Sequence, residues 1–160
     1  MIVVADSSSL RYLILVDSTQ LLQQLFGRVV VPDVVAGELS ATSAPIAVRG
    51  WIAQPPKWIE IVQVSGDAVD AVSDDLDIGE RAAIAVATEL SADVLLIDDA
   101  AGREEARRRG IRVTGTLGVL RAAAERGLID VSAVVTRLKA TNFYVDDALI
   151  EAIFQRWLAP

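Results

Sequence analysis

Short apolar segments separated by helical patterns constrain the fold of this chain more than any other feature. Residues 2–5 and 93–97 consist almost entirely of apolar residues, with no regular polar alternation. Such runs are typical of strands that are buried on both faces of a parallel sheet. The expected strands are residues 2–5, 28–31, 58–64, 93–97 and 111–114. Because helical segments separate them, we predict an α/β protein in which right-handed crossovers connect parallel strands.

Helices are predicted between these strands and after the last of them. Apolar stripes and capping residues place them at residues 10–16, 18–26, 33–39, 46–53, 78–90, 100–109, 116–126, 131–139 and 146–158. The clearest is 78–90, where Ala82, Val86 and Leu90 share one face and Asp77 is well placed as the N-terminal cap. Residues 7–9 after the first strand are expected to form a polar turn.

The length and the apolar runs indicate one domain without a membrane span. A chain of 160 residues fits a single domain of ordinary size, so residues 1–160 are expected to form one unit. The longest apolar runs, such as 82–87, are far shorter than the roughly 20 residues that cross a bilayer. Asp6 also interrupts the apolar stretch that a signal peptide would need. We therefore expect a cytoplasmic protein.

Residue types that are missing narrow the possible chemistry. The chain has no cysteine and no histidine, which excludes thiolate nucleophiles, zinc–thiolate sites and imidazole bases. The 22 acidic residues outnumber 15 Lys and Arg and give a net charge of −7. A metal site in this chain would therefore be rich in carboxylates and suit Mg²⁺ or Mn²⁺. Because an acidic protein does not attract phosphate backbones in general, any nucleic-acid contact must be local.

Several acidic residues occur where parallel strands end or helices begin. Asp6 follows the first strand directly, and Asp98 and Asp99 follow the fourth. Ligands of open parallel sheets bind beyond the carboxyl ends of the strands. Glu38 and Glu80 lie on predicted helices with apolar neighbours, where an unpartnered carboxylate is costly. If these carboxylates converge, they repel one another, and a divalent cation would remove the repulsion. The same cation would activate a water molecule that attacks a phosphodiester.

Each acid also has a purely structural interpretation. Asp6 and Asp98 have the position of helix caps, and Glu38 alone would fit a solvated helix surface. Glu80 would complement the dipole in the first turn of its helix. The acids within residues 74–77 have the pattern of a solvated run. Only the complete set of acids favours a metal site.

Five sequence segments together resemble the PIN-domain superfamily, in a branch related to the VapC ribonuclease toxins. They are Val-Ala-Asp-Ser-Ser around Asp6, Glu38 on a helix after a Val-Pro step, Asp77-Ile78-Gly79-Glu80 before an alanine-rich helix, Leu96-Ile97-Asp98-Asp99 with Gly102-Arg103, and Gly-Thr-Leu-Gly-Val-Leu at 115–120. The resemblance covers nearly the whole chain. It implies a three-layer α/β/α fold with a central parallel sheet of about five strands.

The resemblance also implies an activity and a set of site residues. The activity is that of a Mg²⁺- or Mn²⁺-dependent endoribonuclease, often paired with an antitoxin protein. Carried over by position, the catalytic acids are Asp6, Glu38, Glu80 and Asp98, and the metal ligands are Asp6, Glu80, Asp98 and Asp99. The hydroxyl position beside the first aspartate is Ser7 or Ser8. Two features depart from the toxin pattern: the third acid is a glutamate, and the fourth position is ambiguous between Asp98 and Asp99.

Arginine side chains offer contacts for the RNA phosphates. The predicted substrate-binding residues are Arg81, Arg103, Ser7 and Ser8. Arg107, Arg108 and Arg109 are alternatives, but they wrap most of a helical turn, and pairing with Glu104 and Glu105 would explain them equally well. The apolar tail, including the helix at 146–158, is expected to pack on the core or to form a homodimer or antitoxin interface.

Three functional hypotheses follow from the sequence. The leading one is a metal-dependent endoribonuclease that acts as a toxin with an antitoxin partner. The second is a catalytically silent PIN-like module that binds RNA or protein, which the acidic charge and Glu80 favour. The third is a phosphotransfer domain with Asp6 as nucleophile. It is weak, because Ser8 stands where a second aspartate is needed and the only lysines are Lys57 and Lys139.

Overall fold

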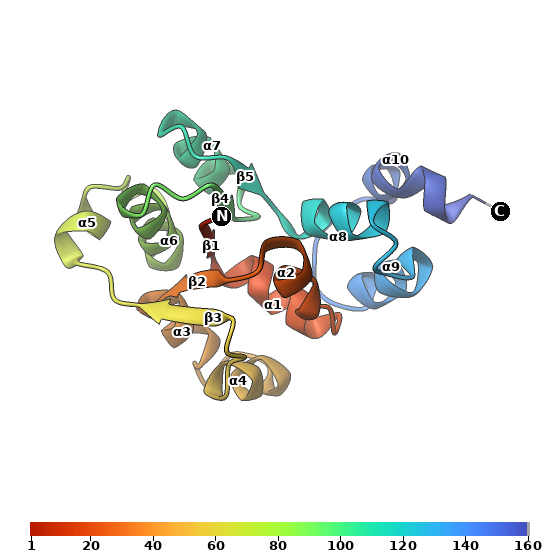
Figure 1. Cartoon of the computed structure of the whole chain (residues 1–160), viewed down its shortest axis with the longest axis horizontal. Coiled ribbons are helices and arrows are strands. Elements are labelled where there is room, and N and C mark those ends of the chain that lie inside the picture. Colours follow the sequence, from red (N-terminus) through yellow and green to blue (C-terminus); the bar gives the residue numbers. More distant parts are fainter. Residues whose placement is uncertain (160) are drawn as a thin grey trace.

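The computed structural model describes residues 1–159 and contains a five-stranded parallel sheet (Figure 1). The strands are β1 (Val3–Ala5), β2 (Val29–Pro32), β3 (Ile59–Val62), β4 (Val94–Leu96) and β5 (Val113–Thr114). Their order across the sheet is β3-β2-β1-β4-β5, and every pair is parallel. The predicted fold class is therefore confirmed. Four strands are shorter than predicted, and residues 58–64 contribute only Ile59–Val62, whereas β2 keeps its predicted length and is shifted by one residue.

Ten helices connect and follow these strands within the described residues. They are α1 (Ser7–Leu15), α2 (Gln20–Phe26), α3 (Asp33–Leu39), α4 (Ile46–Ala53), α5 (Gly66–Asp70), α6 (Ile78–Glu89), α7 (Ala100–Arg108), α8 (Thr116–Glu125), α9 (Val131–Lys139) and α10 (Asp147–Leu158). Two predicted helix starts are wrong. The helix predicted at 18–26 begins at Gln20, and α1 begins at Ser7, with no separate turn at 7–9, because Asp6 occupies the N-cap position directly after β1. No helix in residues 1–159 is long and apolar enough to cross a membrane.

Two hydrophobic cores lie on opposite faces of the sheet. Val3 and Ala5 of β1 pack into one core with residues of α1, α2, α4 and α8. Val4 packs into the other core with residues of α5, α6 and α7. Because successive side chains of a strand point to opposite faces, this alternation assigns the helices to two outer layers. The three-layer α/β/α architecture is thus confirmed.

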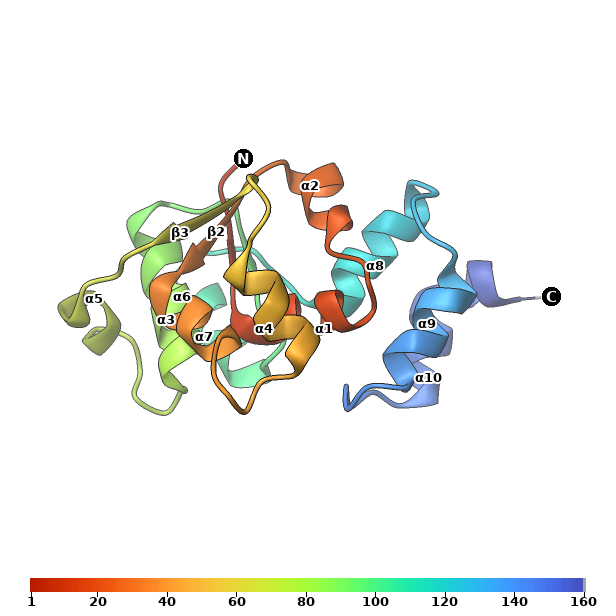
Figure 2. The ribbon, with the colours of Figure 1, turned by 90° about the horizontal axis from the view of Figure 1, so that it is seen from below.

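The last helices extend the first core at one end of the molecule. In Figure 1 and in Figure 2, α9 and α10 lie beyond α8, at the end opposite α5. Ile150 and Phe154 of α10 are almost fully buried in the same core as Val3. Core packing therefore accounts for this face of the apolar tail. Tyr144 and Leu149 remain exposed to solvent.

Candidate active site

The central strands bring two of the predicted acids to the same edge of the sheet. β1 and β4 are neighbours, and Ala5 pairs with Leu96 at their carboxyl ends. The backbone N–H of Asp6 donates to the carbonyl of Leu96 at 2.9 Å, which extends the pairing by one residue. Asp98 follows two residues after Leu96. The topology therefore places Asp6 and Asp98 beyond the same ends of adjacent strands, where open parallel sheets bind ligands.

Asp6 is a buried carboxylate at the centre of this edge. Its residue is 1 % exposed, and its side chain makes no capping hydrogen bond although it occupies the N-cap position of α1. The pKa of Asp6 is raised from 3.8 to about 7, mainly by burial and also by the negative charges of Asp77, Glu38 and Asp98, while the backbone N–H of Ser7 acts in the opposite direction. The acid is therefore not explained by helix capping.

Glu38 of α3 lies half-buried beside the first turn of α1. The hydroxyl of Ser7 donates to Glu38 Oε2 at 3.2 Å and lies 3.5 Å from Asp6 Oδ1. The other oxygen, Oε1, is buried and has no hydrogen-bond partner among the described residues. Burial and the charge of Asp77 raise the pKa of Glu38, and the Ser7 hydrogen bond lowers it. Glu38 therefore does not fit the interpretation as a solvated helix residue.

Glu80 and Asp77 form a capping box at the start of α6. Asp77 Oδ1 accepts from the backbone N–H of Glu80 at 2.8 Å, and Glu80 Oε2 accepts from the N–H of Asp77 at 3.4 Å. Glu80 is only 9 % exposed. Burial raises its pKa to about 8, assisted by the charges of Asp77, Asp99 and Asp6. Glu80 thus lies within electrostatic reach of Asp6.

Asp77 is an acid whose wider role the sequence interpretation missed. It was predicted to be a cap within a solvated run, and the structure confirms the cap. Its charge also raises the pKa of Asp6, Glu38 and Glu80, so it belongs to the same acidic cluster. The sequence signal that could have found it is the second acid three residues before Glu80, at a helix start that also contains Gly79.

Gly79 lets α6 approach α3 closely. A β-carbon at position 79 would overlap with Glu38 Oε1, so only glycine leaves room for the carboxylate in this position. The buried, unpartnered oxygen of Glu38 therefore points at the N-terminus of α6, next to Asp77 and Glu80. This contact joins the acids of α3 and α6 into one site.

The two aspartates after β4 make different hydrogen bonds. Asp98 accepts two hydrogen bonds of 2.7 Å from Thr116, one from the backbone N–H and one from the hydroxyl. Asp99 caps α7, because its Oδ2 accepts from the N–H of Gly102 at 2.9 Å. The interpretation of Asp98 as the cap of this helix is therefore wrong. Asp99 nevertheless contributes its charge to the pKa of Glu80.

Thr116 is a further residue that the sequence interpretation missed. It is fully buried, it begins α8, and it fixes both oxygens of Asp98. Gly115 makes this contact possible, since a β-carbon there would lie 2.5 Å from Asp98 Oδ1. The signal in the sequence is the Gly-Thr pair directly after β5, the strand next to β4.

The predicted substrate-binding residues do not form one group in the structure. Ser7 and Ser8 line a cavity of about 190 Å³ together with Arg11, Glu38 and Asp77. Arg81 lies 3.8 Å from Asp70, so its charge is shared with α5. Arg11 lies within the cavity wall although the sequence interpretation did not select it, and its Nε is buried without a hydrogen-bond partner in the described chain.

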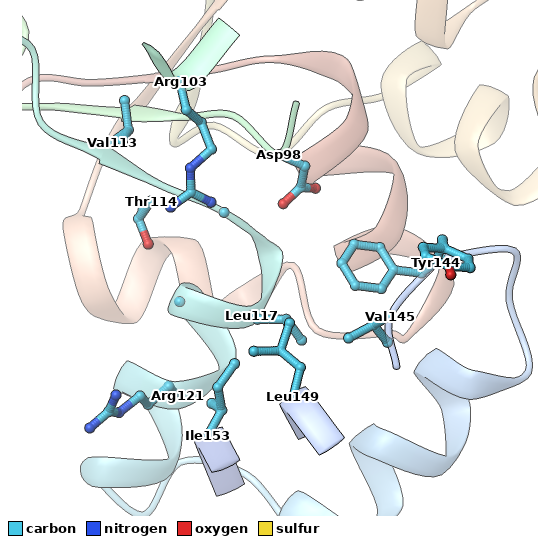
Figure 3. A pocket seen from close by; sticks show the side chains of 13 residues that line it. Asp98, Arg103, Val113, Thr114, Leu117, Arg121, Tyr144, Val145, Leu149 and Ile153 are labelled. Atoms are coloured by element: carbon cyan, nitrogen blue, oxygen red, sulfur yellow. The ribbon is translucent and has the colours of Figure 1, made fainter. Parts of the chain in front are cut away.

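The arginines of α7 differ in their partners. Arg108 and Arg109 both pair with Glu105, at 2.6 and 3.1 Å, which confirms the structural interpretation of these two. Arg103 makes no ion pair with any described residue, and it reaches toward Gly115 and Asp98 (Figure 3). Arg103 is therefore the α7 arginine whose charge is available beside the acids.

The acidic cluster comprises Asp6, Glu38, Asp77, Glu80, Asp98 and Asp99, and its donors suit a hard divalent cation. In the described part of the chain, no three of these side chains are close enough together to hold a metal ion as they are placed. Three of the acids have a raised pKa, and Glu38 Oε1 has no partner. Carboxylates that repel one another in a buried site are the donor set that Mg²⁺ or Mn²⁺ neutralises. The residues present therefore fit such an ion.

Comparison with known proteins agrees with this fold. A family model, DUF3368, described as a PIN domain, matches residues 2–158. A search of curated proteins finds no match. PIN domains have a nuclease-type fold and typically bind divalent metal ions. Because the family model spans nearly the whole chain, the protein belongs to the PIN-domain family.

Proposed function

We propose that the protein is a divalent-metal-dependent endoribonuclease. The proposal rests on the environment of Asp6. This acid is almost fully buried, and burial and three neighbouring acids raise its pKa to about 7. A folded protein keeps such a costly arrangement when a ligand compensates for it. The membership of the PIN-domain family supports nuclease chemistry at this edge of the sheet.

The acidic cluster supplies the residues that would hold Mg²⁺ or Mn²⁺. The proposed ligands are Asp6, Glu80, Asp98 and Asp99, with Asp77 added because its charge acts on the same acids. When bound, the ion would neutralise the acids and make an attacking water more acidic. Binding of the ion would be accompanied by deprotonation of Asp6 and Glu80, since both have pKa values near neutrality in the metal-free site.

The protein's own side chains orient the reacting groups. Thr116 fixes the carboxylate of Asp98, and Ser7 bridges Asp6 and Glu38. The free Oε1 of Glu38 accepts a proton from the attacking water, whose oxygen forms the new bond to phosphorus. The bond from phosphorus to the leaving ribose oxygen breaks, and that oxygen takes a proton from solvent. The guanidinium of Arg103 donates to the phosphate oxygens.

The experiment is RNA cleavage by the purified protein. Single-stranded RNA should be cut internally when Mg²⁺ or Mn²⁺ is present, and cleavage should stop in EDTA and return when excess Mn²⁺ is added. The products are resolved on a denaturing gel. Cleavage that persists at full rate in EDTA contradicts metal dependence, and intact RNA at millimolar Mn²⁺ contradicts the nuclease assignment.

The resemblance to VapC toxins supports a finer proposal. The nuclease would act as the toxin of a toxin–antitoxin pair, as a homodimer in the cytoplasm. The second candidate function is a catalytically silent PIN-like module that binds RNA or protein. It is favoured by the capping bond of Glu80, which occupies one of its oxygens. Mn²⁺ binding without any RNA cleavage would select this second function.

A further inference from the structure

A cavity of about 500 Å³ opens beside Asp98, on the side of the acidic cluster that faces the C-terminal helices (Figure 3). β5 and α8 form one wall, and the segment 143–153 forms the other. Its volume lies within the roughly 300 to 1,000 Å³ of ordinary small-ligand sites. We call this cavity the side pocket. Asp98 lies in its wall, so the side pocket is continuous with the candidate active site.

The side pocket has an apolar floor and an aromatic rim. Leu117 of α8 and Leu149 and Ile153 of α10 line the floor, and Leu149 is 46 % exposed. Phe143 at the rim packs edge-to-face on Tyr12, with ring centroids 4.8 Å apart, so its position is fixed. Tyr144 is 96 % exposed, and its ring makes no aromatic contact within residues 1–159. A flat ring entering the side pocket would find both apolar contact and a stacking partner.

Two of the three charged side chains that line the side pocket are arginines. Arg103 and Arg121 line it together with Asp98, in a chain of net charge −7. Arg121 pairs with Glu125 at 3.2 Å, whereas Arg103 makes no ion pair with the described residues. Figure 3 shows the Arg103 side chain pointing between Thr114 and Asp98. An unpaired guanidinium next to the acidic cluster suits a phosphate, because its planar fork donates to two oxygens.

We propose that the side pocket binds one unpaired nucleotide of the RNA, adjacent to the scissile phosphate. The base of this nucleotide lies on the apolar floor against Tyr144, and the phosphate of the same nucleotide contacts Arg103. This inference rests on the proposed ribonuclease function. A base reaches such a pocket only when it is free of its helix stack, so the protein selects single-stranded RNA over duplex RNA. An apolar segment of a protein partner would use the floor but leave Arg103 without a ligand, so RNA is the occupant that fits both features.

The test is the binding of a fluorescein-labelled single-stranded RNA in EDTA, followed by fluorescence anisotropy at one fixed salt concentration. Tyr144→Ala should weaken binding about tenfold, the size expected for one lost stacking contact. Tyr144→Phe is the matched control and should bind like the wild-type protein, because it keeps the ring. Leu149→Glu places a carboxylate at the exposed edge of the floor and should also weaken binding about tenfold. Duplex RNA of the same sequence should bind less tightly and respond to neither substitution.

Binding in EDTA separates this inference from the proposed function. If binding depends on Tyr144 and Leu149 but no metal supports cleavage, the side pocket stands and the nuclease function fails. If RNA is cleaved and both Tyr144→Ala and Leu149→Glu retain the wild-type Kd and KM, the side pocket is not a nucleotide site. The inference is also overturned if the wild-type protein binds no single-stranded RNA, or if the two variants lose only the binding of another protein. Tyr144 is almost fully exposed, so its substitution leaves the fold intact.

Discussion

Asp6→Asn is expected to lower the rate of RNA cleavage by roughly a hundredfold or more. This is the scale on which single electrostatic groups act in active sites. Asp6 is the buried centre of the acidic cluster, and the charges of three other acids reach it. Asparagine has nearly the same shape but carries no charge, so it cannot neutralise a divalent ion. Initial cleavage rates of single-stranded RNA at saturating Mn²⁺ measure the effect.

The same substitution should make the metal-free protein less sensitive to high pH. The pKa of Asp6 is raised from 3.8 to about 7, so the unfolded chain loses this proton at a lower pH than the folded one. Below the pKa of Asp6 in the unfolded chain, this group does not destabilise the folded protein. As the pH rises from there toward 7, the folded protein loses free energy of unfolding through Asp6. From pH 5 to pH 8 the wild-type protein should lose roughly 2 to 3 kcal/mol through this group. Asp6→Asn should lose correspondingly less, and urea unfolding at the two pH values measures the difference.

Asp74→Asn is the matched control for both measurements. Asp74 is exposed and lies in the loop before α6, so the control removes the same charge outside the acidic cluster. It should retain wild-type cleavage and the wild-type dependence of stability on pH. Cleavage by Asp6→Asn at the wild-type rate would contradict the assignment of Asp6. A pH dependence that is identical in wild type and Asp6→Asn would contradict its raised pKa.

Gly79→Ala is expected to lower the cleavage rate about 10- to 100-fold while the protein remains folded. The new β-carbon would occupy the place of Glu38 Oε1, and the carboxylate must rotate away from the N-terminus of α6. The end of a glutamate side chain is flexible, so this movement costs little stability. It nevertheless removes the proton acceptor from its position beside Asp6. Cleavage rates and thermal melting curves of the variant measure the two effects.

Gly37→Ala provides the matched control within the helix of Glu38 itself. A β-carbon at position 37 meets no atom within 4 Å. This substitution should stabilise the protein by about 0.4 to 1 kcal/mol, because it reduces the conformational freedom of the unfolded chain. Its cleavage rate should equal that of the wild-type protein. Equal rates for Gly79→Ala and Gly37→Ala would show that the position of Glu38 does not matter for the reaction.

The sheet and the placement of Asp6 and Asp98 could be predicted from the sequence because they follow from short-range patterns. Residues 2–5 and 93–97 are mostly apolar runs of the kind that is typical of strands buried on both faces. The residues just beyond each strand then lie at the carboxyl edge of the sheet, and Asp6 directly after β1 and Asp98 two residues after β4 are both placed there. Glu38 and Glu80 were selected for their apolar neighbours, and the burial of Glu80 agrees with that reasoning.

The roles of Asp77 and Thr116 could not be predicted in the same way, because they depend on contacts between distant segments. Asp77 makes the local capping bond that its sequence predicts, and that bond gives no sign of its proximity to Asp6. Thr116 lies 18 residues after Asp98 and meets it only because β5 lies next to β4. Asp98 and Asp99 are adjacent, and the sequence does not show that Asp99, rather than Asp98, caps α7.

Calorimetric titration of Mn²⁺ into the metal-free protein at pH 7 tests most directly whether the acidic cluster is a metal site. Binding should release protons, since Asp6 and Glu80 have pKa values of about 7 and about 8 in the metal-free protein. The measured heat should therefore change with the ionisation enthalpy of the buffer, and Asp6→Asn should bind far more weakly. The absence of any binding at millimolar Mn²⁺, or equal binding by Asp6→Asn, would contradict the account.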